Sequence, residues 1–83
     1  MNRNVRVSFA NYDKHLELGF NVAVYRKKAG MTQEQLAEKA NISRSYMSEI
    51  EAPNMITNIS VEILFNLADA LKIAPAKLLE FRD

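Results

Sequence analysis

Hydrogen-bonding side chains gather on one face of the segment between residues 44 and 51. Wound as a helix at about 100° per residue, this segment places Tyr46, Met47 and Ile50 on one arc. Guanidinium, hydroxyl and carboxylate groups on the other arc can donate and accept hydrogen bonds, but they include no nucleophile paired with a base. The chemistry indicated is recognition of a partner rather than catalysis. The polar arc consists of Arg44, Ser45, Ser48, Glu49 and Glu51.

The serines on this polar arc indicate a role other than helix stability. Serine is a weaker helix former than lysine or glutamate, the residues that usually cover a solvated helix face. Two serines within eight residues therefore favour a surface selected for contact with another molecule.

Composition argues against most catalytic and metal-binding functions. Eighty-three residues allow one small domain, and 48% hydrophobic with 25% charged residues is typical of a folded chain. The absence of cysteine excludes disulfides and thiolate sites, and the single histidine, His15, cannot by itself form a histidine-based metal cluster. We expect no enzyme activity, no cofactor and no metal ion.

Charge and hydropathy bound the partners and the location. No apolar run approaches the roughly 20 residues of a membrane span, and no basic stretch followed by an apolar one opens the chain. We therefore expect a cytoplasmic protein without a membrane partner. The net charge is +1, but residues 1–30 carry six basic and two acidic side chains, whereas residues 31–83 carry five and eight. This asymmetry fits either one basic face or an ordinary solvated surface.

The segment before the polar arc has the signals of a second short helix. Thr32 and Gln35 have the spacing of a capping box, which predicts a helix start. Asn41 tolerates the left-handed conformation that ends a helix, and after Ile42 comes Ser43, a good N-cap for the next helix. Two short helices joined so tightly are typical of a helix-turn-helix. The apolar stripe of the first of these helices is Leu36, Ala37 and Ala40.

The remaining segments predict a compact all-α domain of five helices over residues 13–83. A helix over 13–29 precedes Gly30, and another over 61–72 follows the N-cap Ser60. Apolar residues cover more than half the circumference of the 61–72 helix, so it is either buried on two sides or part of a subunit interface. Pro75 predicts a last helix that ends near Phe81, with Leu78 and Leu79 inward. The expected core contains Met31, Leu36, Met47, Ile50, Leu64, Leu67 and Leu71.

Residues 1–12 form an N-terminal arm with two possible structures. Val5, Val7 and Phe9 alternate with polar residues, which is the pattern of a short β-strand. A disordered arm is the alternative.

The ordered set of residues from Gly19 to Leu79 resembles the lambda-repressor-like, or XRE-type, helix-turn-helix family. The densest match is the run RKKAGMTQEQLAEKANISRSYMSEIE at positions 26–51. The residues at 67–71, followed by Leu78 and Leu79, are similar to the closing helices of that family. The resemblance implies that the second helix of the pair, near 43–51, lies in the major groove of DNA while the first crosses the phosphate backbone.

The resemblance also implies a role for each polar residue in the pair. Arg44 would bind guanine O6 and N7 bidentately, and Glu49 would accept from cytosine N4. The implied base contacts are Arg44, Ser45, Ser48 and Glu49. The implied backbone contacts are Arg26, Lys27, Lys28, Thr32, Gln33, Ser43, Tyr46 and Asn54.

Three of these residues have an alternative interpretation. Tyr46 either packs beneath the helix or places its hydroxyl on a phosphate, and Lys27 and Lys28 are either solvated charges or DNA contacts. Glu51 fits better as an internal partner of a base such as Arg26 than as a DNA contact. Many relatives have a basic residue and a glycine after the recognition helix, whereas here Ala52-Pro53 opens a loop about two residues longer.

These observations predict a sequence-specific DNA-binding transcriptional regulator, a repressor that binds a palindromic operator as a homodimer. The apolar surplus of the 61–72 helix is the main candidate for the dimer interface, with Phe81 and the arm as further candidates. The alternative is a protein-interaction module such as the antitoxin of a toxin-antitoxin-like system, favoured by the near-neutral charge and the apolar residues of the loop.

Overall fold

Capping side chains determine where three of the helices begin. The hydroxyl oxygens of Thr32, Ser43 and Ser60 accept hydrogen bonds from the backbone N–H three residues later, at 3.0, 3.0 and 3.2 Å. Gln35 Oε1 accepts from the Thr32 N–H at 2.8 Å, which completes the predicted capping box. Each cap satisfies a backbone donor that has no partner within the helix.

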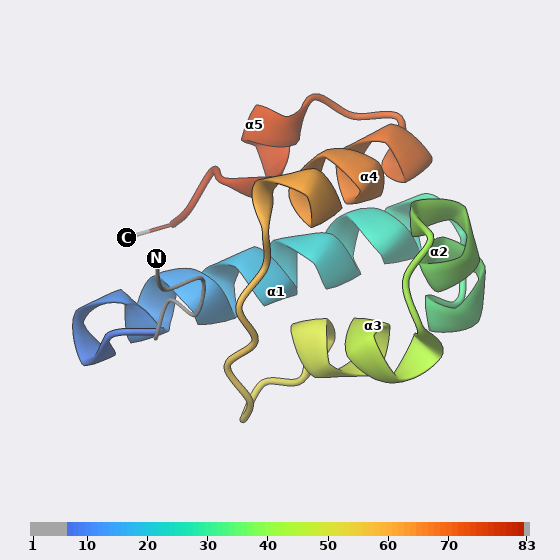
Figure 1. Cartoon of the computed structure of the whole chain (residues 1–83). Helices are drawn as coiled ribbons and strands as arrows, with labels where there is room; N and C mark the ends of the chain where they lie inside the picture. The colour runs from blue at the N-terminus through green and yellow to red at the C-terminus, as the bar shows by residue number, and fades with distance from the viewer. Residues whose placement is uncertain (1–6, 83) are drawn as a thin grey trace.

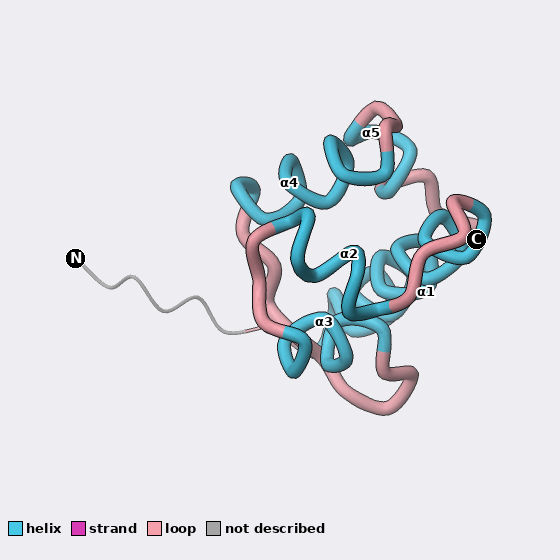
Figure 2. Tube along the Cα trace, turned by 90° about the vertical axis from the view of Figure 1, so that its right-hand side faces the viewer, coloured by secondary structure: helices cyan, strands magenta, loops and turns pink. Residues whose placement is uncertain are grey.

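The computed structural model describes residues 7–82 and contains five α-helices in that range, with no strand. The long helix α1 runs through the molecule, with α3 against one side and α4 and α5 on the other (Figure 1). Helix α2 lies between α3 and α4 and packs against both (Figure 2). No helix among these residues has the length and apolar character needed to cross a membrane. The elements are a 3-10 turn η1 (Phe9–Asn11), α1 (Tyr12–Lys28), α2 (Gln33–Ala40), α3 (Arg44–Glu51), α4 (Val61–Leu71) and α5 (Pro75–Leu78).

Left-handed residues end three of the helices. Gly30 follows α1 with φ of 72°, and Asn41 ends α2 with φ of 61°, both as predicted. Lys72 ends α4 with φ of 59°, a conformation that few side chains other than Asn and Asp adopt readily. The prediction of a helix through residue 72 is therefore one residue too long.

The core lies where α1, α2, α3 and α4 meet. Five of the seven predicted core residues are buried, and Met31 and Leu64 are partly buried against them. The buried apolar side chains are Val22, Leu36, Ala37, Ala40, Met47, Ile50, Leu67, Ala68, Leu71 and Leu78.

At the ends of the chain, one of the two structures considered for the arm and the predicted end of the last helix are wrong. Val7 has no regular secondary structure and Phe9 belongs to η1 with its side chain 93% exposed, so the arm is not a strand over residues 7–12. A strand needs a neighbouring strand to pair with, and residues 7–82 contain none. Val5 lies outside the described residues. Helix α5 ends at Leu78, and Leu79 is 48% exposed instead of buried.

A buried amide holds the segment after α5 against α1. Asn21 is 8% exposed, and its Nδ2 donates to the backbone oxygens of Leu78 at 3.0 Å and Glu80 at 3.1 Å. Both carbonyls lack helical partners because α5 ends there. The Asn21 amide thereby holds the C-terminal segment against the middle of α1.

Candidate nucleic-acid interface

Helix α3 turns four of the five residues of its predicted polar arc to solvent, and Glu51 is the exception because its side chain turns inward and is 5% exposed. Met47 and Ile50 are 0% and 4% exposed, which fixes the rotation of the helix about its own axis. The opposite side chains then point outward because they lie about half a turn away. All four residues predicted to contact bases are exposed, namely Arg44, Ser45, Ser48 and Glu49.

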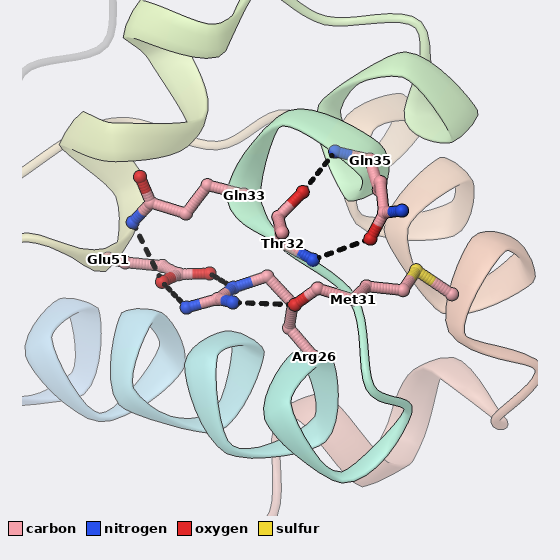
Figure 3. A network of polar contacts seen from close by, with 6 residues as sticks. All are labelled: Arg26, Met31, Thr32, Gln33, Gln35 and Glu51. Carbon is pink, nitrogen blue, oxygen red and sulfur yellow. Dashed lines mark hydrogen bonds and ion pairs between the residues drawn. The ribbon is translucent and has the colours of Figure 1, made fainter.

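The end of α3 is anchored by a polar network (Figure 3). Arg26 Nε donates to Glu51 Oε2 at 2.7 Å and Arg26 Nη2 to Oε1 at 2.9 Å, a bidentate pair. Arg26 Nη1 donates to the backbone oxygen of Met31 at 2.7 Å, and Gln33 Nε2 donates to Glu51 Oε1 at 3.0 Å. The network joins α1, the start of α2 and the end of α3. The prediction that Glu51 is an internal partner of Arg26 is confirmed.

This network gives Arg26 a positioning role. Its side chain is 11% exposed and that of Glu51 5%, so both are largely withdrawn from water. The hydrogen bond to Glu51 raises the pKa of Arg26 against the lowering effect of burial, and the charge of Glu51 adds to the increase. The guanidinium remains charged and is engaged by protein groups on three nitrogens. Arg26 therefore supports the interface from behind, and we do not include it among the proposed phosphate contacts.

The other residues predicted to contact the backbone divide into three locations. Lys27 and Lys28 are exposed in the last turn of α1, and the Lys28 ammonium lies 5.6 Å from the centroid of the Tyr25 ring. Asn54 is exposed in the loop after α3. The third location is the pair of N-termini at α2 and α3, with exposed Thr32, half-buried Gln33 and exposed Ser43.

Tyr46 has a role that sequence reasoning did not identify. The half-buried ring packs against the core, and the hydroxyl donates to the backbone oxygen of Asn58 at 2.9 Å. This bond ties the loop over residues 52–60 to α3. Burial, and secondarily the negative charge of Glu49, raises the pKa of Tyr46, so the hydroxyl stays protonated and keeps its donor.

Tyr46→Phe is expected to lower the free energy of unfolding by about 1 kcal/mol near neutral pH, because the hydrogen bond from the Tyr46 hydroxyl to the Asn58 carbonyl is removed. A tyrosine whose pKa is raised on folding contributes stability that is lost as pH rises from about 10 through its folded pKa. Tyr46→Phe should therefore lose less stability than the parent protein as the pH rises above about 10. Urea unfolding at pH 7 and 10.5 measures both effects.

Tyr12→Phe is the matched control, since Tyr12 is 40% exposed. It should leave the stability at neutral pH nearly unchanged. Equal effects of the two substitutions would contradict the role assigned to Tyr46.

The geometry of α2 and α3 defines a class of protein. Helices α2 and α3 are joined through a left-handed Asn41, and the second presents an exposed hydrogen-bonding face while its apolar face is buried. This arrangement is a helix-turn-helix. Among the described residues, no group of three histidines or carboxylates is arranged to hold a metal ion.

Comparison with known proteins identifies the family. The family model described as helix-turn-helix matches residues 22–78, and the chain belongs to this family. The resemblance to XRE-type regulators is thereby confirmed. The transcriptional regulator SinR of Bacillus licheniformis is 36% identical over 66 residues, which cover 80% of this chain and 59% of that protein. The chain thus spans a little over half the length of this relative.

Solved structures agree with this assignment. The restriction-modification controller protein C.AhdI from Aeromonas hydrophila has a TM-score of 0.75 and 31% identity, over 81% of this chain and 98% of that one. SinR in complex with DNA has a TM-score of 0.70 and 36% identity, over 76% and 98% of the two chains. SinR has also been solved in complex with the protein SinI, with a TM-score of 0.69 and 36% identity over 76% and 60% of the chains.

Proposed function

We propose that this protein is a transcriptional regulator, a repressor that binds a specific double-stranded DNA sequence through α3. The observation that carries the proposal is the exposed polar face of α3, held rigidly from behind by Arg26 and Glu51. A preorganised helix loses little conformational entropy on binding, which favours recognition. The structure of the relative SinR with DNA supports the same class of ligand.

Each polar side chain of α3 has a proposed partner on the DNA. Arg44, in the first turn, donates to guanine O6 and N7, and Glu49 accepts from cytosine N4. Ser45 and Ser48 are short enough to let the helix approach the base edges, and they donate or accept as the sequence requires. These four contacts supply the specificity.

Phosphate contacts supply affinity and orientation. Lys27 and Lys28 provide charge at the end of α1, and Asn54 reaches from the loop that Tyr46 holds. The N-termini of α2 and α3 direct backbone N–H groups outward, where they favour a phosphate. The residues at these termini are Thr32, Gln33 and Ser43.

The protein binds its operator as a homodimer in this proposal. Val61 and Phe65 are 62% and 48% exposed one turn apart on α4, and Leu79 beyond α5 is 48% exposed. These large apolar side chains gain stability when a second copy covers them. Two copies of α3 about 34 Å apart would then enter successive major grooves of a palindromic site.

Arg44→Ala is expected to weaken binding to the selected site by about 1–3 kcal/mol and to relax specificity at one base pair per half-site. Lys28→Ala should weaken binding to all sequences alike and reduce the salt dependence. Fluorescence anisotropy on sites selected from random DNA, repeated at several salt concentrations, separates the two effects.

Lys77→Ala is the matched control because it removes the same charge from α5, on the opposite side of α1 from α3 (Figure 1). It should leave binding nearly unchanged. If no sequence is selected, or if Arg44→Ala and Lys77→Ala bind equally well, recognition by α3 is wrong.

A protein partner is the second candidate function, in the manner of an antitoxin. The loop after α3 exposes 47% of Met55, and the relative SinR has been solved with the protein SinI. One stoichiometric partner in a pull-down, together with no salt-dependent DNA affinity, would favour this function over the first.

A further inference from the structure

Helix α1 is apolar on two opposite faces, of which the core uses only one. Leu18 and Val22 face the core, and Gly19 packs beneath the end of α3. About half a turn away, a second stripe faces outward with alternating spacings of three and four residues. Helices pair along a stripe of this spacing. Its members are Asp13, Leu16, Phe20, Ala23 and Lys27, and Val24 lies beside Ala23 on the same groove.

This outward stripe forms the floor of a groove of about 800 Å³. The end of α3 with Pro53 lies on one side, and the C-terminal segment with Phe81 and Arg82 lies on the other. At its centre, Phe20 remains 48% exposed although the Arg82 guanidinium lies 4.3 Å from its ring centroid. Arg82 is itself oriented by an ion pair with Glu17 at 3.0 Å.

We propose that a second copy of this chain covers the stripe, with the two α1 helices antiparallel about a two-fold axis at Phe20. In an antiparallel pair centred on residue 20, facing positions sum to 40. Position 13 then faces 27 of the second copy, 16 faces 24, and 20 faces 20. The two copies bury Leu16, Phe20 and Val24 against each other.

Charge complementarity selects the second copy in this orientation. Asp13 lies at one end of the stripe and Lys27 at the other, both are exposed, and neither forms an ion pair within residues 7–82. The antiparallel pair brings Asp13 to Lys27 at both ends and sets the two helix dipoles antiparallel, which is favourable. A parallel pair would instead place like charges together. A two-fold contact of this kind is self-complementary and closes.

The proposed contact is distinct from the operator dimer. It uses α1, whereas the dimer proposed on DNA uses α4, so one chain has two surfaces for two copies. If both surfaces are used at once, operator dimers are joined into larger assemblies. Lys27 is shared between this contact and the phosphates, so DNA and self-association compete for it.

A single-cysteine experiment without DNA tests the contact directly, since the chain has no cysteine of its own. Phe20→Cys places a thiol beside the two-fold axis, where facing residues of a close helix pair come near disulfide range. Mild oxidation should give a disulfide-linked dimer. Lys39→Cys, exposed on α2, is the matched control and should remain monomeric under the same conditions.

Charge reversal tests the orientation while keeping Phe20 in place. In a Phe65→Lys background, which removes the exposed apolar contact proposed for α4, Asp13→Lys and Lys27→Asp should each weaken self-association about fivefold in sedimentation velocity. Each substitution creates two like-charge pairs in the two-fold contact. The double variant Asp13→Lys with Lys27→Asp should restore the constant of the Phe65→Lys parent. Either a monomeric parent at all concentrations or additive losses in the double variant would overturn the proposal. Equal oxidation of the two cysteine variants would do the same.

Discussion

Gly19→Ala is expected to lower the free energy of unfolding by about 3 kcal/mol, the upper range for overpacking a core. A Cβ at this position would overlap the carbonyl oxygen of Ile50 and lie 3.3 Å from its carbonyl carbon. Both atoms belong to the backbone, so no side-chain rotation relieves the overlap. The end of α3 would have to move away from α1.

The sign of the effect makes this a strict test. Where a helix has space, replacing glycine with alanine stabilises it by about 1 kcal/mol. Urea unfolding of Gly19→Ala should show the opposite. Gly30→Ala is the matched control, since nothing lies within 4 Å of its added Cβ and only its φ of 72° is unfavourable. It should cost about 1 kcal/mol. A Gly19→Ala variant as stable as the parent would show that α3 does not approach α1 this closely.

Glu51→Ala is expected to lower the free energy of unfolding by about 3–5 kcal/mol, the range for removing one partner of a buried pair. The substitution leaves the Arg26 guanidinium largely withdrawn from water without its carboxylate, and Gln33 loses its acceptor. Glu80→Ala is the control for an exposed pair, since Lys77 lies 3.6 Å from Glu80 and both are more than half exposed. It should cost less than about 1 kcal/mol.

The double variant Arg26→Met with Glu51→Met tests whether the loss of stability comes from a buried charge left without its partner. Apolar side chains of similar volume remove both charges at once, so most of the stability lost in Glu51→Ala should return. If the double variant is as unstable as the single one, the charge left without a partner is not the cause.

Substitutions at Gly19 and at the Arg26–Glu51 pair should also weaken DNA binding. Gly19 and the Arg26–Glu51 pair both hold the end of α3 against α1, seven residues apart along α1. Moving that end misdirects Ser48 and Glu49 together. We therefore expect both variants to lose affinity for every sequence, in contrast to the single-position effect of Arg44→Ala.

The helix-turn-helix and the exposed face of α3 can be predicted from the amino-acid sequence alone. The capping box at Thr32 and Gln35, the left-handed Asn41 and the N-cap Ser43 are interactions within a few residues, so the local sequence is enough to predict them. The outward direction of the four residues proposed to contact bases follows from the helical period, because Met47 and Ile50 are buried on the opposite side of α3.

Packing between the helices determines which residues support that face and which remain free to bind. Arg26 and Glu51 are 25 residues apart, and Asn21 and Leu78 are 57 apart, so no local pattern determines their distance in space. The resemblance assigned Arg26 to the DNA, whereas packing of α1 against α3 assigned it to Glu51. A glycine within a helix, such as Gly19, indicates a close approach of another segment, but the sequence does not show which backbone segment makes that contact. Local propensity determines where each helix forms, whereas the contacts between helices depend on how their apolar faces fit together.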